Sequence, residues 1–486
     1  MSPAETLLAA LAVPIAGAGL IAAAHRVPNL REGITLATAV TLFALVASLL
    51  PQVAAGDRPA ITLFEVMPGI ALRLVVEPLG MLFAVIASGL WIVNSLYSIG
   101  YMRGNKEAHQ TRFYVCFAGA LAAAIGVAFA GNLFTLFLFY EALSLITYPL
   151  VTHHGTPEAM RAGRVYLGIL IGTSIALFLV AIIWTWQLTG TMEFRPGGIL
   201  GGDIPNATVG LLLALYVFGI GKAAVMPVHR WLPAAMVAPT PVSALLHAVA
   251  VVKAGVFSVL KIVVYVFGVD AIAGLTSVDW LPFMAGFTII AASIVALRAD
   301  NLKRRLAYST VSQLSYVVLA AALLTPLSII GAALHIATHA LGKITLFFAA
   351  GAIYTAAHKT EVSQLDGIGW RMPWTMGAFA VGALSLIGVP PAAGFVSKWF
   401  IISGAIDAGH MTAVAVLVAS TLLNAAYFLP IVYRAFFVAP PDDGHHAHGE
   451  APLAMVVALV LTAAGTVALF FLIDWPLALA RQLASG

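Results

Sequence analysis

Cysteine and charged residues are both scarce in this sequence. Its 486 residues include one cysteine, Cys116, and only 9% Asp, Glu, Lys and Arg. Soluble domains carry about 25% charged residues, so we expect lipid to solvate most of this chain. A single cysteine excludes a disulfide framework, a zinc cluster and an iron–sulfur site built from this chain alone. A glycine-rich dinucleotide fingerprint is also missing. We therefore expect no cofactor and no metal, and any redox chemistry would belong to another subunit.

Hydrophobic residues are abundant instead, at 61% of the chain with a mean hydropathy of +1.00. A transmembrane helix needs about 20 apolar residues, and fourteen segments meet this requirement. The predicted fold class is therefore an all-α polytopic membrane protein with about fourteen transmembrane helices. The predicted spans are 4–24, 33–51, 76–101, 112–130, 132–152, 164–187, 206–226, 241–267, 280–297, 306–323, 327–355, 375–403, 411–437 and 452–474.

Several of these spans contain residues that break helices. Pro239 and Pro241 open the eighth span, the sequence GVPPAAG at 388–394 interrupts the twelfth, and Pro430 falls in the thirteenth. A further break is predicted around Lys222–Pro227. Proline removes a backbone donor and clashes with the preceding turn, so we expect broken helices at these positions.

Basic residues orient the chain, because cytoplasmic loops carry the excess of Lys and Arg. Fifteen lie in loops after odd-numbered spans and three in loops after even-numbered spans. The bias predicts that both termini lie on the non-cytoplasmic side. The net charge of +4 is scattered over short loops, so no nucleic-acid partner is expected. The segment 60–75 alternates around Pro68 and Gly69, which predicts a small hairpin on the outer face. The tract DDGHHAHGE at 442–450 is interpreted as a solvated loop rather than a metal site.

Ionisable side chains nevertheless occur inside the predicted spans. A charge at the centre of a membrane helix costs about 2.5–3.5 kcal/mol on insertion scales, and such residues usually face a wet interior or a partner. His335, His339 and Lys343 are each four residues apart and therefore share one helix face. Lys261, near a helix end, is interpreted as reaching toward the surface. The intramembrane ionisable residues are Glu141, Lys222, His247, Lys253, Lys261, His335, His339, Lys343 and Lys398.

Structural interpretations compete with a functional one for some of these residues. A single buried histidine is often only a helix–helix hydrogen bond, and Glu141 could be part of a structural ion pair. The aromatic cluster that includes Phe137 and Tyr140 is interpreted as lipid or helix packing. The tenth span, however, carries a polar stripe of Ser309, Ser312, Gln313 and Tyr316. Together with the lysines and histidines, this stripe favours a hydrated path along which a proton can move.

Four long motifs resemble the antiporter-like subunits shared by respiratory complex I, membrane-bound hydrogenases and Mrp-type multisubunit Na⁺/H⁺ antiporters. The resemblance extends over about residues 76–437, and the sequences GFVSKW and LLNAAYFLPIVYRAFF (422–437) are most similar to the D-type subunits of Mrp antiporters. The motifs are FGIGKAAVMPVHRWLPAAMVAPTPVSALLHAVAVVKAG (218–255), DNLKRRLAYSTVSQLSY (300–316), HIATHALGKITLFFAAG (335–351) and SLIGVPPAAGFVSKW (385–399).

This resemblance implies two inverted five-helix repeats, helices 4–8 in residues 112–268 and helices 9–13 in residues 280–437. They would be flanked by helices 1–3 in 1–111 and by a loop and helix 14 in 438–486. It implies a charge switch formed by Glu141 and Lys222. The implied proton relay continues through His247, Lys253, His335, His339 and Lys343 to Lys398. The tenth helix has no acid equivalent to Glu141, so a neighbouring subunit would supply the second carboxylate.

The expected function is proton translocation by a D-like subunit of an Mrp-type antiporter in a bacterial inner membrane. The expected partners are other membrane subunits, protons, the lipid bilayer and, as a further ion, Na⁺. Two alternatives stay open at this point. One is a proton-pumping subunit of a complex I-like NADH:quinone oxidoreductase or a membrane-bound hydrogenase, and the other is a scaffold that conducts nothing.

Overall fold

The computed structural model describes residues 1–440 and 449–485, and helices dominate this part of the chain. Most of the 442–450 tract lies outside the described residues. The first elements are α1 (Pro3–Ala23), α2 (Pro28–Ala54), β1 (Ala60–Met67), β2 (Ile70–Val75), α3 (Pro78–Gly104), α4 (Gln110–Ala128) and α5 (Leu133–Val151). They are followed by α6 (Pro157–Thr173), α7 (Leu179–Thr189), α8 (Asn206–Gly219), α9 (Trp231–Ala234), α10 (Thr240–Ala244), α11 (Val251–Ile262) and α12 (Val269–Ile272). The remaining helices are α13 (Trp280–Arg298), α14 (Leu302–Ala322), α15 (Pro326–Ala357), α16 (Pro373–Ile387), α17 (Gly394–Asp407), α18 (Met411–Phe437), α19 (Leu453–Phe471) and α20 (Asp474–Ala484).

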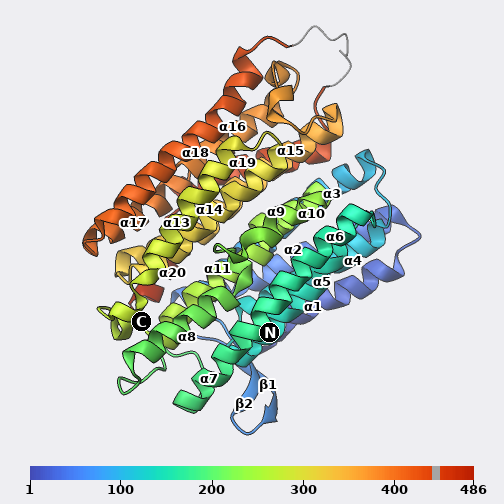
Figure 1. Ribbon diagram of the computed structural model, residues 1–486. Helices are drawn as coiled ribbons and strands as arrows, with labels where there is room; N and C mark the ends of the chain where they lie inside the picture. Colours follow the sequence, from blue (N-terminus) through green and yellow to red (C-terminus); the bar gives the residue numbers. More distant parts are fainter. Residues whose placement is uncertain (441–448, 486) are drawn as a thin grey trace.

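The long helices run side by side along a common direction (Figure 1). Eleven helices of the described residues are long and apolar enough to cross a membrane, which confirms the all-α polytopic fold class. Three other predicted spans correspond to the short α8, to the more polar α14, and to the interrupted pair α16 and α17. Helices suit this environment because their backbone donors and acceptors are paired within the segment.

Helix starts follow local sequence signals. Ser2 caps α1 and forms a reciprocal capping box with Glu5. The Asn132 side chain accepts a hydrogen bond from the backbone of Thr135 at 2.8 Å and so caps α5. Proline occupies the first turn of α2, α3, α6, α15 and α16, where its missing donor would be unpaired in any case.

The predicted hairpin is present, and it protrudes from one end of the bundle, near the ends of α7 and α8 (Figure 1). Strands β1 and β2 pair antiparallel from Ala60 opposite Val75 to Met67 opposite Ile70. Gly69 has a φ of +80°, a backbone conformation that glycine adopts without steric cost.

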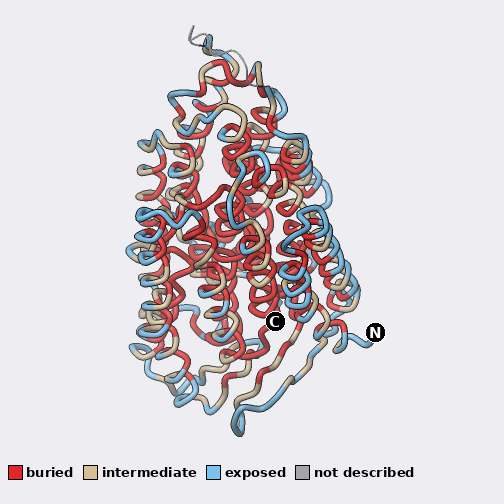
Figure 2. Tube along the Cα trace, turned by 90° about the vertical axis from the view of Figure 1, so that its right-hand side faces the viewer, coloured by how far each residue is buried: buried red, intermediate tan, exposed pale blue. Residues whose placement is uncertain are grey.

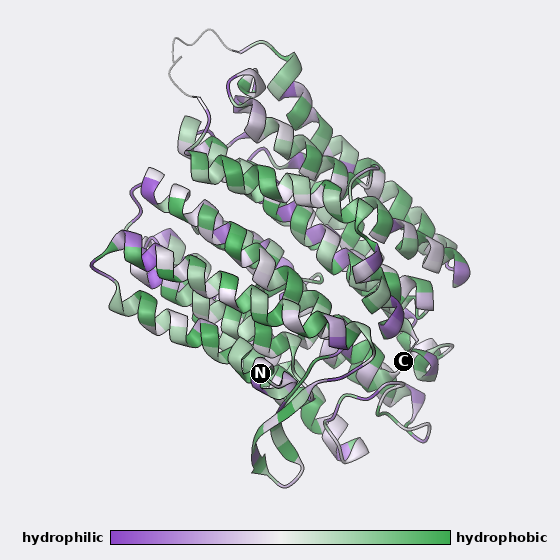
Figure 3. Cartoon of the chain, turned by 180° about the vertical axis from the view of Figure 1, so that it is seen from behind, coloured by the Kyte–Doolittle hydropathy of each residue, from purple (hydrophilic) through white to green (hydrophobic). Residues whose placement is uncertain are grey.

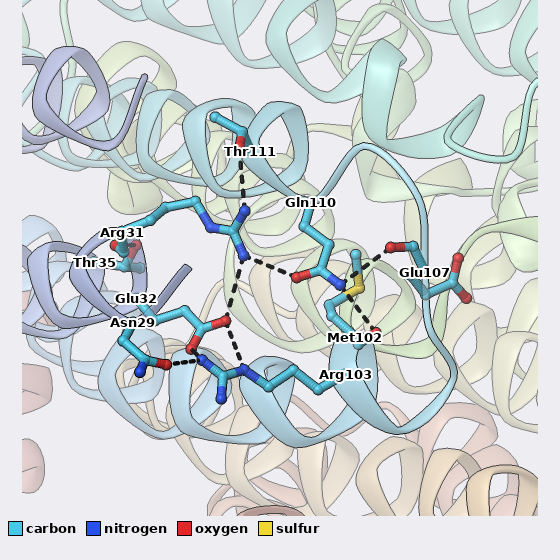
Figure 4. A network of polar contacts seen from close by, with 9 residues as sticks. All are labelled: Asn29, Arg31, Glu32, Thr35, Met102, Arg103, Glu107, Gln110 and Thr111. Atoms are coloured by element: carbon cyan, nitrogen blue, oxygen red, sulfur yellow. Dashed lines mark hydrogen bonds and ion pairs between the residues drawn. The ribbon is translucent and has the colours of Figure 1, made fainter. Parts of the chain in front are cut away.

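A partly buried polar network ties α2, α3 and the start of α4 together (Figure 4). The Glu32 carboxylate forms ion pairs with Arg31 and Arg103. Arg31 also donates to the Gln110 side chain at 2.8 Å. Arg31 and Glu32 are both buried, so this network fixes the ends of three helices rather than exposing a charged loop.

The three predicted interruptions around Lys222, Pro239–Pro241 and 388–394 are all present. α8 ends at Gly219 and a 3₁₀ turn, Gly221–Ala223, follows it. α10 begins at Thr240, and a π-helical turn at Leu245–Val249 separates it from α11. α16 ends at Ile387 and α17 begins at Gly394.

The prediction that Pro430 breaks the thirteenth span is wrong. α18 runs without interruption from Met411 to Phe437, with Pro430 inside it. A single proline leaves only a few backbone groups of a membrane helix to be paired again by its neighbours. It therefore does not end the helix.

The two most enclosed segments are the ones that carry most of the predicted relay. In the most apolar 18-residue stretch of each span, 100% of the residues are buried in Thr240–Phe267 and 94% in α15. The corresponding share in α1 is 39%. Figure 2 shows the buried residues concentrated along the interior of the bundle. Figure 3 shows hydrophobic residues over most helices, with hydrophilic ones in the loops and at scattered positions along some helices. The segment Thr240–Phe267 and α15 are therefore shielded from lipid by the surrounding helices.

Candidate functional site

Seven of the eight predicted relay residues are buried, with at most 5% of their surface exposed. The exception is Glu141, which is only partly buried on α5. Removing so many ionisable groups from water is costly unless each one finds a polar partner. The partners of each residue therefore define the site.

Lys222 lies in the short 3₁₀ turn after α8 and points toward α5. Its Nζ donates to the backbone carbonyl of Tyr140 at 2.8 Å and to Ser144 Oγ at 2.5 Å. Nζ also lies 3.2 Å from the centre of the Tyr140 ring. The Tyr140 hydroxyl in turn accepts a hydrogen bond from the Lys222 backbone at 3.1 Å. Tyr140 is therefore a direct partner of Lys222, and its interpretation as packing alone is wrong.

Glu141 and Lys222 are electrostatic neighbours but not a direct ion pair. Each charge acts on the other, yet no ion pair among the described residues brings their charged atoms within 4.0 Å. The Glu141 side chain interacts instead with Ser174, in the π-helical turn Ser174–Phe178 between α6 and α7. The structure thus shows the predicted pair in a separated arrangement.

A glycine brings the Lys222 turn against the helix that carries Lys253. A Cβ on Gly255 would lie 2.3 Å from the carbonyl carbon of Lys222 and from the backbone nitrogen of Ala223. No larger residue fits at such a distance from a backbone. Gly255 therefore permits the close contact between the 3₁₀ turn and α11.

Lys253 on α11 is hydrogen-bonded to Nδ1 of His339 on α15. His339 also lies 5.8 Å from His335 between ring centres and near Lys343 and His247. His247 itself packs against Phe347 with ring centres 4.7 Å apart. It has no direct hydrogen bond to Lys253 in the described structure.

His335 continues the row toward α17. Its Nδ1 lies 2.9 Å from Ser397 Oγ, and Thr338 Oγ1 contacts the same hydroxyl at 2.9 Å. The rings of His335 and His339 are 5.8 Å apart between centres. Ser397 is the residue directly before Lys398, so the hydroxyl ties α15 to the helix that carries the last predicted relay lysine.

Lys343 faces α14, as the polar stripe on that helix predicts. Its Nζ donates to Ser309 Oγ at 2.9 Å and, more weakly, to the Leu306 carbonyl at 3.4 Å. The Tyr427 hydroxyl on α18 donates to the same Ser309 hydroxyl at 3.1 Å. α14 contains no Asp or Glu, so hydroxyls and carbonyls take the place of a carboxylate here.

Lys398 is held by the interruption between α16 and α17. Its Nζ donates to the carbonyls of Leu386 and Ile387 at 2.7 and 3.0 Å. These carbonyls have no partner within the helix because α16 ends at Ile387, and a cation is favoured at a helix C-terminus. A Cβ on Gly394 would lie 1.9 Å from the Ser385 carbonyl oxygen, so glycine is required where α17 starts.

The interpretation of Lys261 as a lysine that reaches the surface is wrong. Its side chain is completely buried and forms an ion pair with Glu77 at 2.7 Å. Its Nζ also donates to the Ala130 carbonyl at 2.7 Å. Glu77 precedes α3 by one residue and belongs to no motif, so no sequence pattern indicated that the two would meet.

Several partners escaped the sequence prediction because they are small hydroxyls or backbone carbonyls. Ser144 has no periodic or motif signal, and Ser397 lies in the GFVSKW motif without being singled out there. A search for hydroxyls one helical turn from Glu141, or beside Lys398, would have selected them. The structure therefore brings Lys253, His339, His335 and Lys398 near one another in one row. Lys222 is bonded to α5 and Lys343 to α14.

These features define a polytopic helical membrane protein with an internal row of ionisable side chains beside broken helices. Such residues mark ion or proton pathways in membrane proteins. The model of the NADH:quinone oxidoreductase/Mrp antiporter transmembrane family matches residues 130–424, and the chain belongs to this family.

Individual relatives include subunits of NADH-quinone oxidoreductases and of cation/proton antiporters. The N subunit of the NADH-quinone oxidoreductase of Desulforudis audaxviator is 35% identical over 83% of this chain and 82% of that protein. The D subunit of the Na⁺/H⁺ antiporter of Alkalihalophilus pseudofirmus is 29% identical over 75% of this chain and 73% of that protein. A chain in the structure of the Mrp complex from Dietzia sp. shares the fold, with a TM-score of 0.87 at 23% identity, covering 100% of this chain and 97% of that one.

Proposed function

We propose that the chain translocates protons as one subunit of a larger membrane complex. The observation that carries this proposal is the contact between Lys253 and His339, together with the position of His335 between His339 and the charge of Lys398. Each member can bind or release a proton, or pass one through a hydroxyl. Packing alone would not require such a row.

The Glu141 and Lys222 pair acts as the switch in this mechanism. Two opposite charges about 4 Å apart attract by about 4 kcal/mol at an effective dielectric near 20. When Glu141 approaches Lys222, the protonated lysine is stabilised. When they separate, Lys222 keeps only neutral partners, Ser144 and the carbonyl and ring of Tyr140, and can release its proton toward Lys253. The proton then moves through His339 and His335, alongside Lys343, to Lys398.

The finer proposal is a D-like subunit of an Mrp-type antiporter, driven by a sodium gradient. It is supported by the motifs around Lys398 and 422–437 and by the similarity to the D subunit of a Na⁺/H⁺ antiporter. Its partners would be other membrane subunits, one of which would supply the acid that α14 lacks. We place the complex in a bacterial inner membrane, with both termini on the non-cytoplasmic side. The charge bias of the loops supports this orientation.

The second candidate is a proton-pumping subunit of a redox-driven, complex I-like assembly. The observation that favours it is the 35% identity with the N subunit of an NADH-quinone oxidoreductase, above the 29% identity with the antiporter D subunit. Purification of the intact complex through a tag on this chain separates the two. Small Mrp-type membrane subunits support the first candidate, and a module that oxidises NADH or hydrogen supports the second.

Proton transport itself is tested by Lys253→Met in everted membrane vesicles that contain the whole complex. We expect complete loss of sodium- or substrate-driven proton movement at normal abundance. The matched control is Lys359→Met, which removes a loop lysine and should retain exchange. Equal exchange in both variants would show that the row is structural and that the chain is a scaffold.

A further inference from the structure

A groove of about 560 Å³ opens beside the polar network of Figure 4, where α2 begins and α3 ends. It is lined by Val27, Pro28, Asn29, Arg103, Lys106 and Gln110. These residues belong to the start of α2, the end of α3 with the turn after it, and the start of α4, on the face that the loop charges assign to the cytoplasm. The groove therefore lies where the helix bundle meets the surface of the membrane.

Positive charge exceeds negative charge around this groove. The guanidinium groups of Arg31 and Arg103 share the single carboxylate of Glu32 (Figure 4). Lys106 adds a third cation, and its side chain forms no ion pair among the described residues. The carboxylate of Glu107 is directed at two histidines, at distances of 3.4 and 3.9 Å. The groove therefore keeps an excess of positive charge, which attracts an anion.

Hydrogen-bond donors are available at the same place. The Arg103 side chain is 47% exposed. It donates to Asn29 Oδ1 at 2.6 Å and to the Glu32 carboxylate, and its second terminal nitrogen, Nη1, has no partner among the described residues. α2 begins at Pro28 without a side-chain cap, and the backbone N–H groups of Asn29 and Leu30 have no acceptor in the described part of the chain. Free N–H groups at a helix start favour phosphate oxygens, so charge and donors select the same kind of ligand.

An apolar strip leads from the groove along α2. Its members are spaced by three or four residues and therefore share one helix face, and all are exposed: Leu30, Gly33, Ala37 and Val40. No neighbouring atom lies within 4 Å of the Cβ position of Gly33, so the strip is open beside the helix. α2 is apolar enough to cross a membrane, so lipid covers this face. An acyl chain can therefore follow the strip from a headgroup in the groove.

We propose that the groove binds the phosphodiester headgroup of an anionic phospholipid, with Arg103 and Lys106 on the phosphate and an acyl chain along the Leu30–Val40 strip. Basic pockets between membrane helices on the cytoplasmic side suit such headgroups. The apolar strip favours a lipid over a free phosphate ion, which would use the cations alone. The lipid gives Arg103 a second anionic partner beside Glu32 and holds the end of α3 against the start of α2. This inference goes beyond the proposed function and does not depend on it.

A photoreactive lipid locates the site in the purified whole complex. The probe is phosphatidylglycerol with a diazirine in one acyl chain, and mass spectrometry identifies the peptides that it labels. We expect labelling within residues 27–40. Excess unlabelled phosphatidylglycerol should suppress this labelling, whereas equal concentrations of phosphatidylcholine or inorganic phosphate should leave it unchanged.

Two variants of Lys106 test the dependence on charge. Because this side chain forms no ion pair in the described structure, its replacement leaves the Glu32 network intact. Lys106→Gln should weaken binding of the probe about fivefold, the contribution of one basic residue at an anionic membrane surface. Lys106→Glu should weaken it further. The matched control is Arg161→Glu, an exposed position on α6 at the same face and outside the groove, which should keep wild-type labelling.

Four results would overturn the proposal. Equal labelling of residues 27–40 by a phosphatidylcholine probe would indicate ordinary boundary lipid, and suppression by inorganic phosphate would indicate a site for free anions. Unchanged labelling in Lys106→Glu would remove the role of charge. A carbodiimide crosslink from Lys106 to a carboxylate of another subunit, without lipid labelling, would assign the groove to a protein partner. Proton transport in Lys253→Met bears only on the proposed function, so the two proposals can fail separately.

Discussion

Lys253 and His339 are hydrogen-bonded to each other from α11 and α15, two helices that belong to different predicted repeats. Both residues are buried, so each one is a direct polar partner of the other in the interior. A proton on Lys253 therefore has an acceptor in the second half of the molecule within direct reach. This contact, more than any single lysine, makes a path between the two halves physically possible.

The switch should behave as a unit. Glu141→Ala and Lys222→Ala should each reduce proton movement by about a hundredfold or more, the scale of loss when an acid–base group is removed. The double variant should be no worse than either single one, because coupled residues are not additive. Vesicle transport at matched protein abundance measures this, and losses that multiply would contradict a shared switch.

Ser144 offers a milder test of how Lys222 is held. Ser144→Ala removes the hydroxyl 2.5 Å from Nζ while leaving the Tyr140 carbonyl in place. A hydrogen bond to a charged group contributes about 1.5–3 kcal/mol, so we expect a slower but measurable exchange. Ser48→Ala is the control, since this exposed serine on α2 bonds only to its own helix. Exchange equal to that of the control would mean that Ser144 does not set the state of Lys222.

Proton movement through the chain should stop when the side chain at position 398 cannot release its proton. Lys398→Arg keeps the charge and can still donate to the Leu386 and Ile387 carbonyls. Arginine, however, stays protonated under physiological conditions. We expect normal abundance in the membrane and loss of ion-coupled proton movement in everted vesicles. Lys398→Glu should retain some activity, because a carboxyl group can titrate. Wild-type exchange with arginine would make Lys398 an anchor of the helix break.

Lys261 and Glu77 should matter for stability rather than transport. Lys261→Met leaves the Glu77 carboxylate buried without its partner, which costs about 3–5 kcal/mol. Adding Glu77→Gln to it removes the stranded charge and should recover much of that loss. Thermal unfolding of the purified complex in detergent measures both. A double variant as unstable as Lys261→Met would show that the unpaired charge is not the cause.

The orientation of the chain can be measured directly. Reporter domains fused after Arg305 and after Arg371 should report the cytoplasm, and a fusion at 270–275 should report the outer side. The expectation follows from the fifteen-to-three bias of basic residues in the loops. A cytoplasmic signal at 270–275 would overturn the orientation of α11 and α13 and the inverted-repeat interpretation with it.

The sequence alone determined the helical membrane fold and most of the places where helices break. Apolar runs of span length leave few other options, since lipid offers no partners to an open backbone. Proline and glycine mark breaks reliably where they cluster, as at 388–394. The lone Pro430 did not break α18, because neighbouring groups can compensate for one missing donor.

Only the tertiary structure decided which buried groups meet. Glu77 and Lys261 are distant in sequence, and neither belongs to a periodic pattern, so their ion pair could not be predicted. Ser144 and Ser397 became partners of Lys222 and His335 through the way helices pack, which no single-helix spacing contains. The separation of Glu141 from Lys222 depends on the positions of α5 and of the turn after α8. Sequence spacing fixes neighbours on one helix, whereas contacts between helices depend on packing of the whole bundle.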